Sequence, residues 1–264
     1  MQTYLRAGIV LLSILLVLVA CSNTENENRQ KKKKEVHITI SAAVSLKESL
    51  EEIEMIYVKD HPEVKLDFNF GGSGSLQQQI SQGAPVDIFF SAAEDKFDLL
   101  VDDGAIAKED GVDLLKNELV LVVPKGDISR IASLEDVTKD EVGRISIGTP
   151  ETVPAGKYAK ESLESLHIWN SVQEKTIYAK DVRQVLSYVE TGNVEAGLVY
   201  KTDALVSEKV VIAASVDTDT HASIVYPVGV LRKSKQYEAA KEFYEYLQSA
   251  AALKVFDKYG FITE

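Results

Sequence analysis

Four loops of this sequence carry residue types that suit the binding of a small anion. They are residues 41–45, 70–75, 148–156 and 179–182, and in each a β-type run ends in small or turn-forming residues before a helical pattern begins. The first turn of a helix offers free backbone N–H groups and the positive end of the helix dipole, and both favour an anion. Each loop alone also fits a simple helix cap or turn. Their recurrence therefore indicates an anion site.

Motifs for catalysis and for metal binding fit poorly. Gly71 to Ser75 lacks the second glycine of a Gly-x-Ser-x-Gly elbow. Gly148 to Lys157 has seven residues between its two glycines, which is the wrong spacing for a phosphate-binding P-loop. The histidines are dispersed, with no His-Glu-x-x-His pattern. We therefore expect a protein that is not an enzyme and that holds no cofactor.

Alternating strand and helix patterns must position these loops. From Val36 onward, short β-type runs alternate with helical runs, and the first helical run has apolar residues at i, i+4, i+7 and i+11, namely Leu46, Leu50, Ile53 and Tyr57. This alternation is typical of a parallel α/β sheet. In open α/β sheets, ligands bind at the carboxyl ends of the strands. The four loops should therefore gather at those ends.

The chain contains two such α/β series. The first begins at Val36 and the second at Leu119, and a late β-type run starts at Ile224. We expect two lobes joined by extended crossing segments. Residues 36–118 plus 224–264 should form lobe 1, and residues 119–223 should form lobe 2.

Composition indicates a folded protein that does not bind nucleic acid. Of the 264 residues, 45% are hydrophobic and 27% are charged, which is typical of a globular chain. There are 29 Lys plus Arg residues against 41 Asp plus Glu residues, a net charge of −12. Such a chain repels a phosphate backbone, because nucleic-acid binding depends on clustered cations.

The amino terminus has the pattern of an exported protein. After Arg6, residues 7–20 form a run of 14 mostly apolar residues, whereas a membrane-spanning helix needs about 18 to 20. Residues 1–20 are therefore predicted to be a signal peptide. The sequence ending in Cys21, Leu-Val-Ala-Cys, resembles the lipobox of bacterial lipoproteins. That resemblance implies a lipid anchor on Cys21, which two acyl chains would make stable. Residues 22–34 contain no apolar side chain, so we expect residues 21–35 to form the lipidated cysteine and a flexible tether.

Motifs spread from about Val36 to Phe261 closely resemble the molybdate-binding proteins of bacterial molybdenum ABC transporters. They are Ala42-Ala43-Val44-Ser45-Leu46, Phe70-Gly71-Gly72-Ser73-Gly74-Ser75-Leu76, Gly83-Ala84-Pro85-Val86-Asp87-Ile88-Phe89, Val153-Pro154-Ala155-Gly156-Lys157-Tyr158-Ala159-Lys160-Glu161, Asp181-Val182-Arg183, Gly197-Leu198-Val199-Tyr200 and Tyr259-Gly260-Phe261.

The resemblance implies an α/β, two-lobed periplasmic-binding-protein-like fold of type II, with the ligand in the cleft between lobes. Such a protein captures molybdate or tungstate and delivers it to an ABC permease. Carried over by motif, Ser45 and Ser73 are the ligand serines, Ala155 and Val182 the backbone donors, and Tyr200 the hydroxyl donor. Molybdenum would be bound only as the oxyanion. We expect a monomer, anchored to the outer face of the cytoplasmic membrane.

The chemistry of these residues fits a ligand without protons. None of them is a carboxylate, whereas a site for monohydrogen phosphate also needs an acceptor, and Asp181 is the one carboxylate that adjoins the set in sequence. Relatives often have serines at the positions of Gly72 and Gly74, so this loop should offer fewer accessory donors. Sulfate or another tetrahedral oxyanion stays an alternative ligand, and a secreted hydrolase using Ser45 or Ser73 stays an alternative function.

Overall fold

The computed structural model describes residues 35–126 and 131–263. Residues 1–34, which include the predicted signal peptide, Cys21 and nearly all of the predicted tether, lie outside the described residues. Val36–Glu264 forms one compact unit. Within the described part of the chain, no helix is long and apolar enough to cross a membrane.

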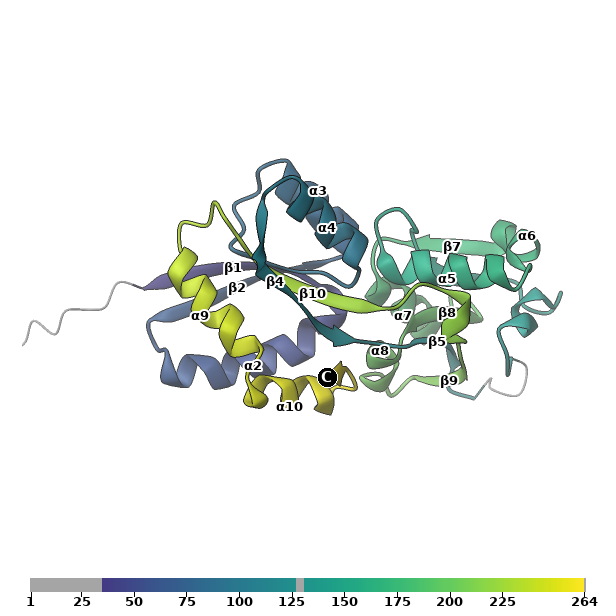
Figure 1. The fold of residues 1–264 in the computed structure, drawn as a ribbon. Coiled ribbons are helices and arrows are strands. Elements are labelled where there is room, and N and C mark those ends of the chain that lie inside the picture. Colours follow the sequence, from purple (N-terminus) through teal and green to yellow (C-terminus); the bar gives the residue numbers. More distant parts are fainter. Residues whose placement is uncertain (1–34, 127–130, 264) are drawn as a thin grey trace, which may run out of the picture. The chain divides into compact units, whose positions relative to one another are not determined.

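The first of two sheets formed by the described residues has the strand order β11-β4-β10-β3-β1-β2 (Figure 1). Its strands are β1 (Val36–Ala43), β2 (Val64–Gly71), β3 (Ile88–Phe90), β4 (Ile106–Lys116), β10 (Val225–Leu231) and β11 (Ile262–Thr263). Strand β1 is parallel to β2 and β3, but β10 is antiparallel to β3 and β4. The expected parallel sheet is thus wrong in this respect, because the chain returns through β10 in the opposite direction and makes the sheet mixed.

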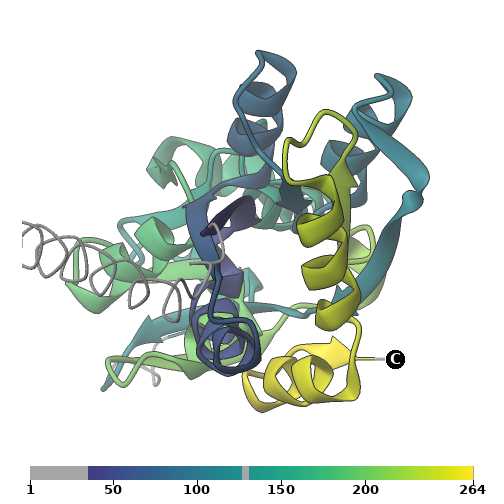
Figure 2. The same ribbon diagram turned by 90° about the vertical axis from the view of Figure 1, so that its left-hand side faces the viewer.

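Helices cover both faces of the first sheet (Figure 2). On one face lie α3 (Ser73–Ser81) and α4 (Glu94–Asp102); on the other lie α2 (Lys47–Asp60), α9 (Tyr237–Leu247) and α10 (Ala250–Lys258). The face that α2 buries carries Leu50, Ile53 and Tyr57, as its apolar spacing predicts. Burying one such apolar side chain fully contributes about 1.5 to 3 kcal/mol, so this stripe determines which side of α2 meets the sheet.

The second sheet has the order β7-β6-β8-β5-β9 and is also mixed. Its strands are β5 (Leu119–Pro124), β6 (Ile145–Gly148), β7 (Thr176–Ala179), β8 (Ala196–Tyr200) and β9 (Val210–Ser215). Strand β6 is parallel to β7 and β8, and β5 is antiparallel to β8 and β9. The α-helices of this part are α5 (Pro154–Ser165), α6 (Trp169–Val172), α7 (Val182–Glu190) and α8 (Lys201–Leu205), and its short 3-10 turns are η2 (Glu135–Thr138), η3 (Gln173–Lys175) and η4 (Thr218–Thr220).

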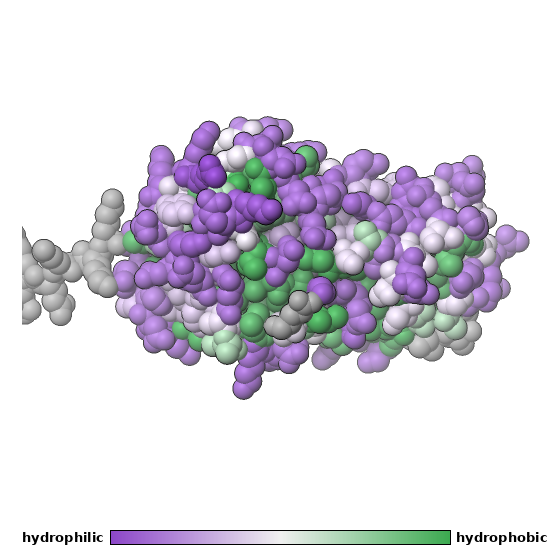
Figure 3. Space-filling model, in the orientation of Figure 1, coloured by the Kyte–Doolittle hydropathy of each residue, from purple (hydrophilic) through white to green (hydrophobic). Residues whose placement is uncertain are grey.

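The chain passes between the two sheets twice. It leaves the first sheet after β4, through residues 117–118, and returns after β9, through residues 216–224. The two crossing segments are joined where the Asn117 N–H donates to the Ile224 carbonyl at 3.2 Å. We call the part built on the first sheet the first lobe and the part built on the second sheet the second lobe. The face drawn in Figure 3 is mostly hydrophilic, with exposed apolar residues confined to smaller patches.

Candidate functional site

The residues singled out in the sequence all line one cavity. Ser45 and Ser73 come from the first lobe, and Ala155, Val182 and Tyr200 from the second. The remaining lining residues are Ala43, Val44, Gly71, Gly72, Ala92, Val153 and Pro154. The cavity is small. The volume that the centre of a water-sized sphere can occupy is about 10 Å³, so the cavity has room for about one water molecule.

Neighbouring parallel strands bring the two serines together. Ser45 lies in the 3-10 turn η1 (Val44–Leu46), directly after β1, and Ser73 is the first residue of α3, after β2. Because β1 and β2 are parallel and pair Ala43 with Gly71, both strands end at the same edge of the sheet. Local sequence therefore places each serine just beyond a strand, and the parallel pairing makes them neighbours.

The second lobe repeats this arrangement with backbone amides. Strands β6 and β7 are parallel and pair Gly148 with Ala179 at their ends. Ala155 is the second residue of α5 and Val182 is the first residue of α7. Among the described residues, no acceptor is hydrogen-bonded to either of these two N–H groups. Both are therefore available as donors at the positive end of a helix.

A glycine lets α5 begin this close to β6. A Cβ on Gly156 would lie 1.9 Å from the carbonyl oxygen of Gly148, which no side chain could tolerate. The first turn of α5, and with it the Ala155 amide, is thus held against the end of the strand.

The hydroxyl groups of the cavity are held by fixed partners. The Ala92 N–H donates to Ser73 Oγ at 2.9 Å, which leaves the Ser73 proton free to point elsewhere. Ser45 Oγ lies 2.9 Å from Tyr226 Oη. Tyr200 Oη donates to the Ala92 carbonyl at 3.5 Å, which is long for a hydrogen bond between oxygens. Burial raises the pKa of Tyr200 well above its ordinary value, so this hydroxyl keeps its proton and acts as a donor.

The cavity is lined by neutral groups. Asp181, the carboxylate adjoining the set in sequence, does not line it, and its Oδ1 instead accepts from the Gln184 N–H at 2.8 Å as the cap of α7. Within residues 35–126 and 131–263, no cluster of three or more His, Cys, Asp or Glu side chains could hold a metal ion. The lining therefore offers an anion several donors and no carboxylate. In a site poor in water, such neutral dipoles act strongly.

The two lobes touch beside the cavity through glycines. The Gly74 N–H donates to the Thr152 carbonyl across the lobes at 3.0 Å. A Cβ on Gly72 would lie 2.8 Å from the Thr152 oxygen, and a Cβ on Gly74 would lie 2.8 Å from Thr152 Cα. The sequence suggested only a loss of accessory donors at these positions. In the structure, Gly72 and Gly74 also allow the two lobes to approach each other closely, because a side chain at either position would keep the lobes apart.

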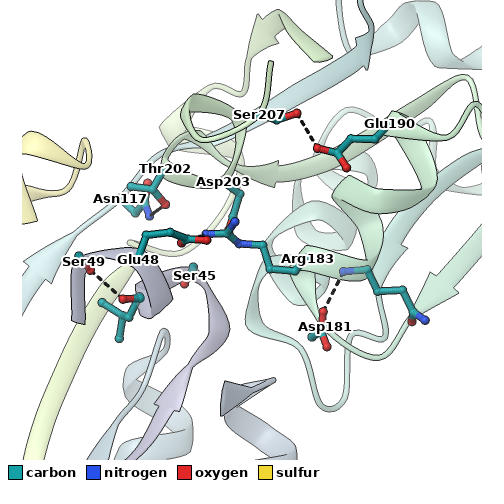
Figure 4. Close-up of polar contacts among 12 residues, drawn as sticks. Ser45, Glu48, Ser49, Asn117, Asp181, Arg183, Glu190, Thr202, Asp203 and Ser207 are labelled. Carbon is teal, nitrogen blue, oxygen red and sulfur yellow. Dashed lines mark hydrogen bonds and ion pairs between the residues drawn. The ribbon is translucent and has the colours of Figure 1, made fainter. Parts of the chain in front are cut away.

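Ion pairs also join the lobes. Lys157 Nζ lies 3.1 Å from Asp95 Oδ2. The Arg183 guanidinium lies between the carboxyl groups of Glu48, in the first lobe, and Asp203, in the second (Figure 4). These partners are far apart along the chain, and no local sequence pattern signals them.

Asp203 is the buried member of the Arg183 cluster. Its side chain is 0% exposed, and its Oδ1 lies 2.6 Å from Arg183 Nε. Burial raises the pKa of Asp203 to about 6, although the Arg183 charge opposes this shift. The carboxyl group is therefore ionised at neutral pH and needs Arg183 as its counter-charge.

The sequence pattern of the bacterial extracellular solute-binding protein family matches residues 38–262. The chain belongs to this family. A Bacillus subtilis (strain 168) protein named putative ABC transporter substrate-binding lipoprotein YvgL is 59% identical over 227 residues, which are 86% of each chain. The molybdate-binding protein ModA of Haemophilus influenzae (strain ATCC 51907 / DSM 11121 / KW20 / Rd) is 37% identical, over 85% of this chain and 89% of that one.

A solved structure resembles the fold over nearly the same range. It is the substrate binding domain of a putative molybdenum ABC transporter from Clostridium difficile, with 41% sequence identity and a TM-score of 0.67, covering 87% of this chain and 99% of that chain. The predicted two-lobed periplasmic-binding-protein-like α/β fold is confirmed, and so is the prediction of a solute-binding protein.

Proposed function

We propose that this chain is an extracytoplasmic solute-binding lipoprotein that captures molybdate or tungstate and delivers it to the permease of an ABC transporter. The observation that carries the proposal is the convergence of Ser45, Ser73, Ala155, Val182 and Tyr200 on one cavity. Hydroxyl and amide donors from both lobes meet there, which suits a small tetrahedral dianion. The relatives named for molybdate or molybdenum binding support this ligand class.

The hydrogen bonds of the cavity favour an anion that carries no proton. A carboxylate is a strong acceptor for the proton of such an oxyanion, and no carboxylate lines the cavity. The two serines do not fit the alternative of a serine hydrolase. Their described contacts are with Tyr226 and the Ala92 amide, and no histidine is bonded to either one.

Capture requires the lobes to move. The five donor residues are at most 4% exposed, so a solute can reach them only when the lobes separate. We propose residues 36–118 plus 224–264 and residues 119–223 as the moving units, with the crossing segments near Asn117 and Ile224 as the hinge. The contact between Gly74 and Thr152 then belongs to the closed state.

Anchoring is proposed from Cys21 and from the printed name of the Bacillus subtilis relative. In this proposal residues 1–20 are removed, Cys21 carries the lipid, and residues 21–35 tether the binding unit to the outer face of the cytoplasmic membrane. The mature protein acts as a monomer.

The experiment is a calorimetric panel of molybdate, tungstate, sulfate and hydrogen phosphate on the purified protein. We expect molybdate and tungstate to bind most tightly. Because only the native state binds, a ligand at 100 times its Kd should raise the free energy of unfolding by about 2.7 kcal/mol. Tighter binding of sulfate would reassign the ligand. A failure of every oxyanion to bind would overturn the proposal.

A further inference from the structure

A chain of buried hydrogen bonds continues from Ser45 away from the cavity. Ser45 Oγ lies 2.9 Å from Tyr226 Oη, and Asn117 Nδ2 lies 3.2 Å from the same Tyr226 oxygen. Asn117 Nδ2 also lies 2.9 Å from Thr202 Oγ1. All four side chains are buried, with at most 7% exposed. Figure 4 shows Asn117 and Thr202 facing each other, with Ser45 nearby.

The orientation of the Asn117 amide sets the direction of this chain. Its Oδ1 accepts from the Glu118 N–H at 2.9 Å, so that side of the amide must be the oxygen. The other side is then the NH₂ group, which has two protons and can only donate. One proton goes to Thr202 Oγ1 and the other to Tyr226 Oη.

Tyr226 passes the direction on to Ser45. Burial raises the pKa of Tyr226 well above its ordinary value, so the hydroxyl keeps its single proton. Since its oxygen accepts from Asn117, that proton is free to go to Ser45 Oγ. With Ser45 Oγ as the acceptor of that proton, the proton of Ser45 itself is directed to another acceptor. The cavity that Ser45 lines is where that acceptor can lie.

We propose that Asn117 and Tyr226 are positioning residues that hold Ser45 as a hydrogen-bond donor and thereby select fully deprotonated oxyanions over protonated ones. This inference rests on the proposed function, since it concerns the ligand of the same cavity. A protonated oxyanion of the same charge carries one O–H of its own. In this cavity that O–H would face the O–H of Ser45, so that two donors meet. That pairing leaves a buried donor without an acceptor, which is costly.

The chain of hydrogen bonds lies where the lobes are joined. Asn117 is in the first crossing segment, Tyr226 is the second residue of β10 after the return crossing, and Thr202 belongs to α8 of the second lobe. The Asn117 N–H is also bonded to the Ile224 carbonyl. The amide that orients Ser45 therefore lies where both crossing segments meet the second lobe, and its orientation is fixed by the Glu118 N–H.

The decisive variant is Asn117→Asp, which replaces the donating NH₂ group by an accepting oxygen. Tyr226 would then donate to the new carboxylate and accept from Ser45, so Ser45 would turn its lone pairs toward the ligand. We expect molybdate to bind about 10 to 150 times more weakly, the loss of one hydrogen bond to a charged group. Hydrogen arsenate should lose much less, because its O–H gains an acceptor.

The readout is the ratio of the Kd for hydrogen arsenate to the Kd for molybdate, measured on the full-length protein in detergent at mildly alkaline pH. The extra negative charge weakens both dianions alike and cancels in this ratio. We expect the ratio to fall at least about tenfold in Asn117→Asp. It should also fall in Tyr226→Phe, which frees the Ser45 hydroxyl to rotate. The matched control, Thr202→Val, removes the other acceptor of Asn117 and should leave the ratio unchanged.

A purely structural role would weaken both anions by the same factor. An unchanged ratio in a folded Asn117→Asp protein would overturn the inference, and so would an unchanged ratio in Tyr226→Phe if the aspartate variant does not fold. Failure of the proposed function is distinct, because the unmodified protein would then not bind molybdate. If it binds sulfate instead, the ratio of hydrogen phosphate to sulfate tests the same inference.

Discussion

Replacing Gly74 by alanine should hold the two lobes apart and weaken ligand binding. The new Cβ would lie 2.8 Å from Thr152 Cα, 3.0 Å from the Thr152 oxygen and 3.1 Å from the Glu151 oxygen. Carbon atoms pack best at about 3.5 to 4.0 Å, so the second lobe would have to retreat by roughly 1 Å. All three clashing atoms belong to the backbone, so a side-chain rotation cannot relieve the contact.

The magnitude follows from the cost of overpacking. Extra carbon in a well-packed contact costs about 1 to 3 kcal/mol, which converts to binding of molybdate about 5 to 150 times weaker. The ligand-free protein should not be destabilised, because Gly74 is in the first turn of α3 and alanine is the better helix former.

Titration calorimetry measures the affinity, and small-angle scattering with and without molybdate measures closure. The matched control is Gly143→Ala, at an exposed glycine outside the cavity, whose Cβ would make only an ordinary contact with Glu195 Oε1 at 3.6 Å. Wild-type affinity and full compaction of the Gly74→Ala protein would refute the assignment of this contact to the closed, ligand-holding state.

The other predictions concern the amides, the buried ion pair and the anchor. Ala155→Pro removes an unpaired N–H at a helix start that tolerates proline, so molybdate should bind about 10 to 150 times more weakly. Ala155→Gly keeps the donor, and calorimetry should show nearly normal binding. Equal affinities of the two variants would exclude that amide as a ligand. Arg183→Met leaves Asp203 without its counter-charge and should cost about 3 to 5 kcal/mol in urea unfolding. The pKa of Asp203, about 6 in the intact pair, should then rise, so the folded variant keeps a proton that the unfolded chain releases. Its loss of unfolding free energy relative to wild type should therefore grow by up to about 1.4 kcal/mol per pH unit above about pH 6. A loss that does not depend on pH would contradict this. Cys21→Ser should release the protein from washed membranes; mature-sized protein retained there would exclude the lipid anchor.

Local patterns were sufficient to predict much of the fold. The stripe on α2 and the β-type runs before each loop follow from side-chain periodicity, which acts within a few residues. The direction of a strand does not follow from side-chain periodicity. For that reason the sequence did not indicate that β10 and β5 are antiparallel to their neighbours β3 and β8. Strand β4 has no such local signal, because its sequence contains Gly111 and several charged residues without an alternating pattern.

The donor residues of the site could be predicted from the sequence, but the residues that hydrogen-bond to them could not. Ser45, Ser73, Ala155 and Val182 all follow strands at helix starts, a signal that is local in sequence. Their supports are not local, since Tyr226 reaches Ser45 across 181 positions. Such contacts depend on the assembled lobes.

The most direct measurement is a crystal structure of the protein with tungstate, with the anomalous signal of the metal used to locate the anion. We predict one peak in the cavity, with the anion's oxygens about 2.7 to 3.2 Å from the hydroxyls of Ser45, Ser73 and Tyr200 and from the amides of Ala155 and Val182. A bound anion located elsewhere, or one in contact with a single lobe of the closed protein, would contradict the assignment of this cavity as the binding site.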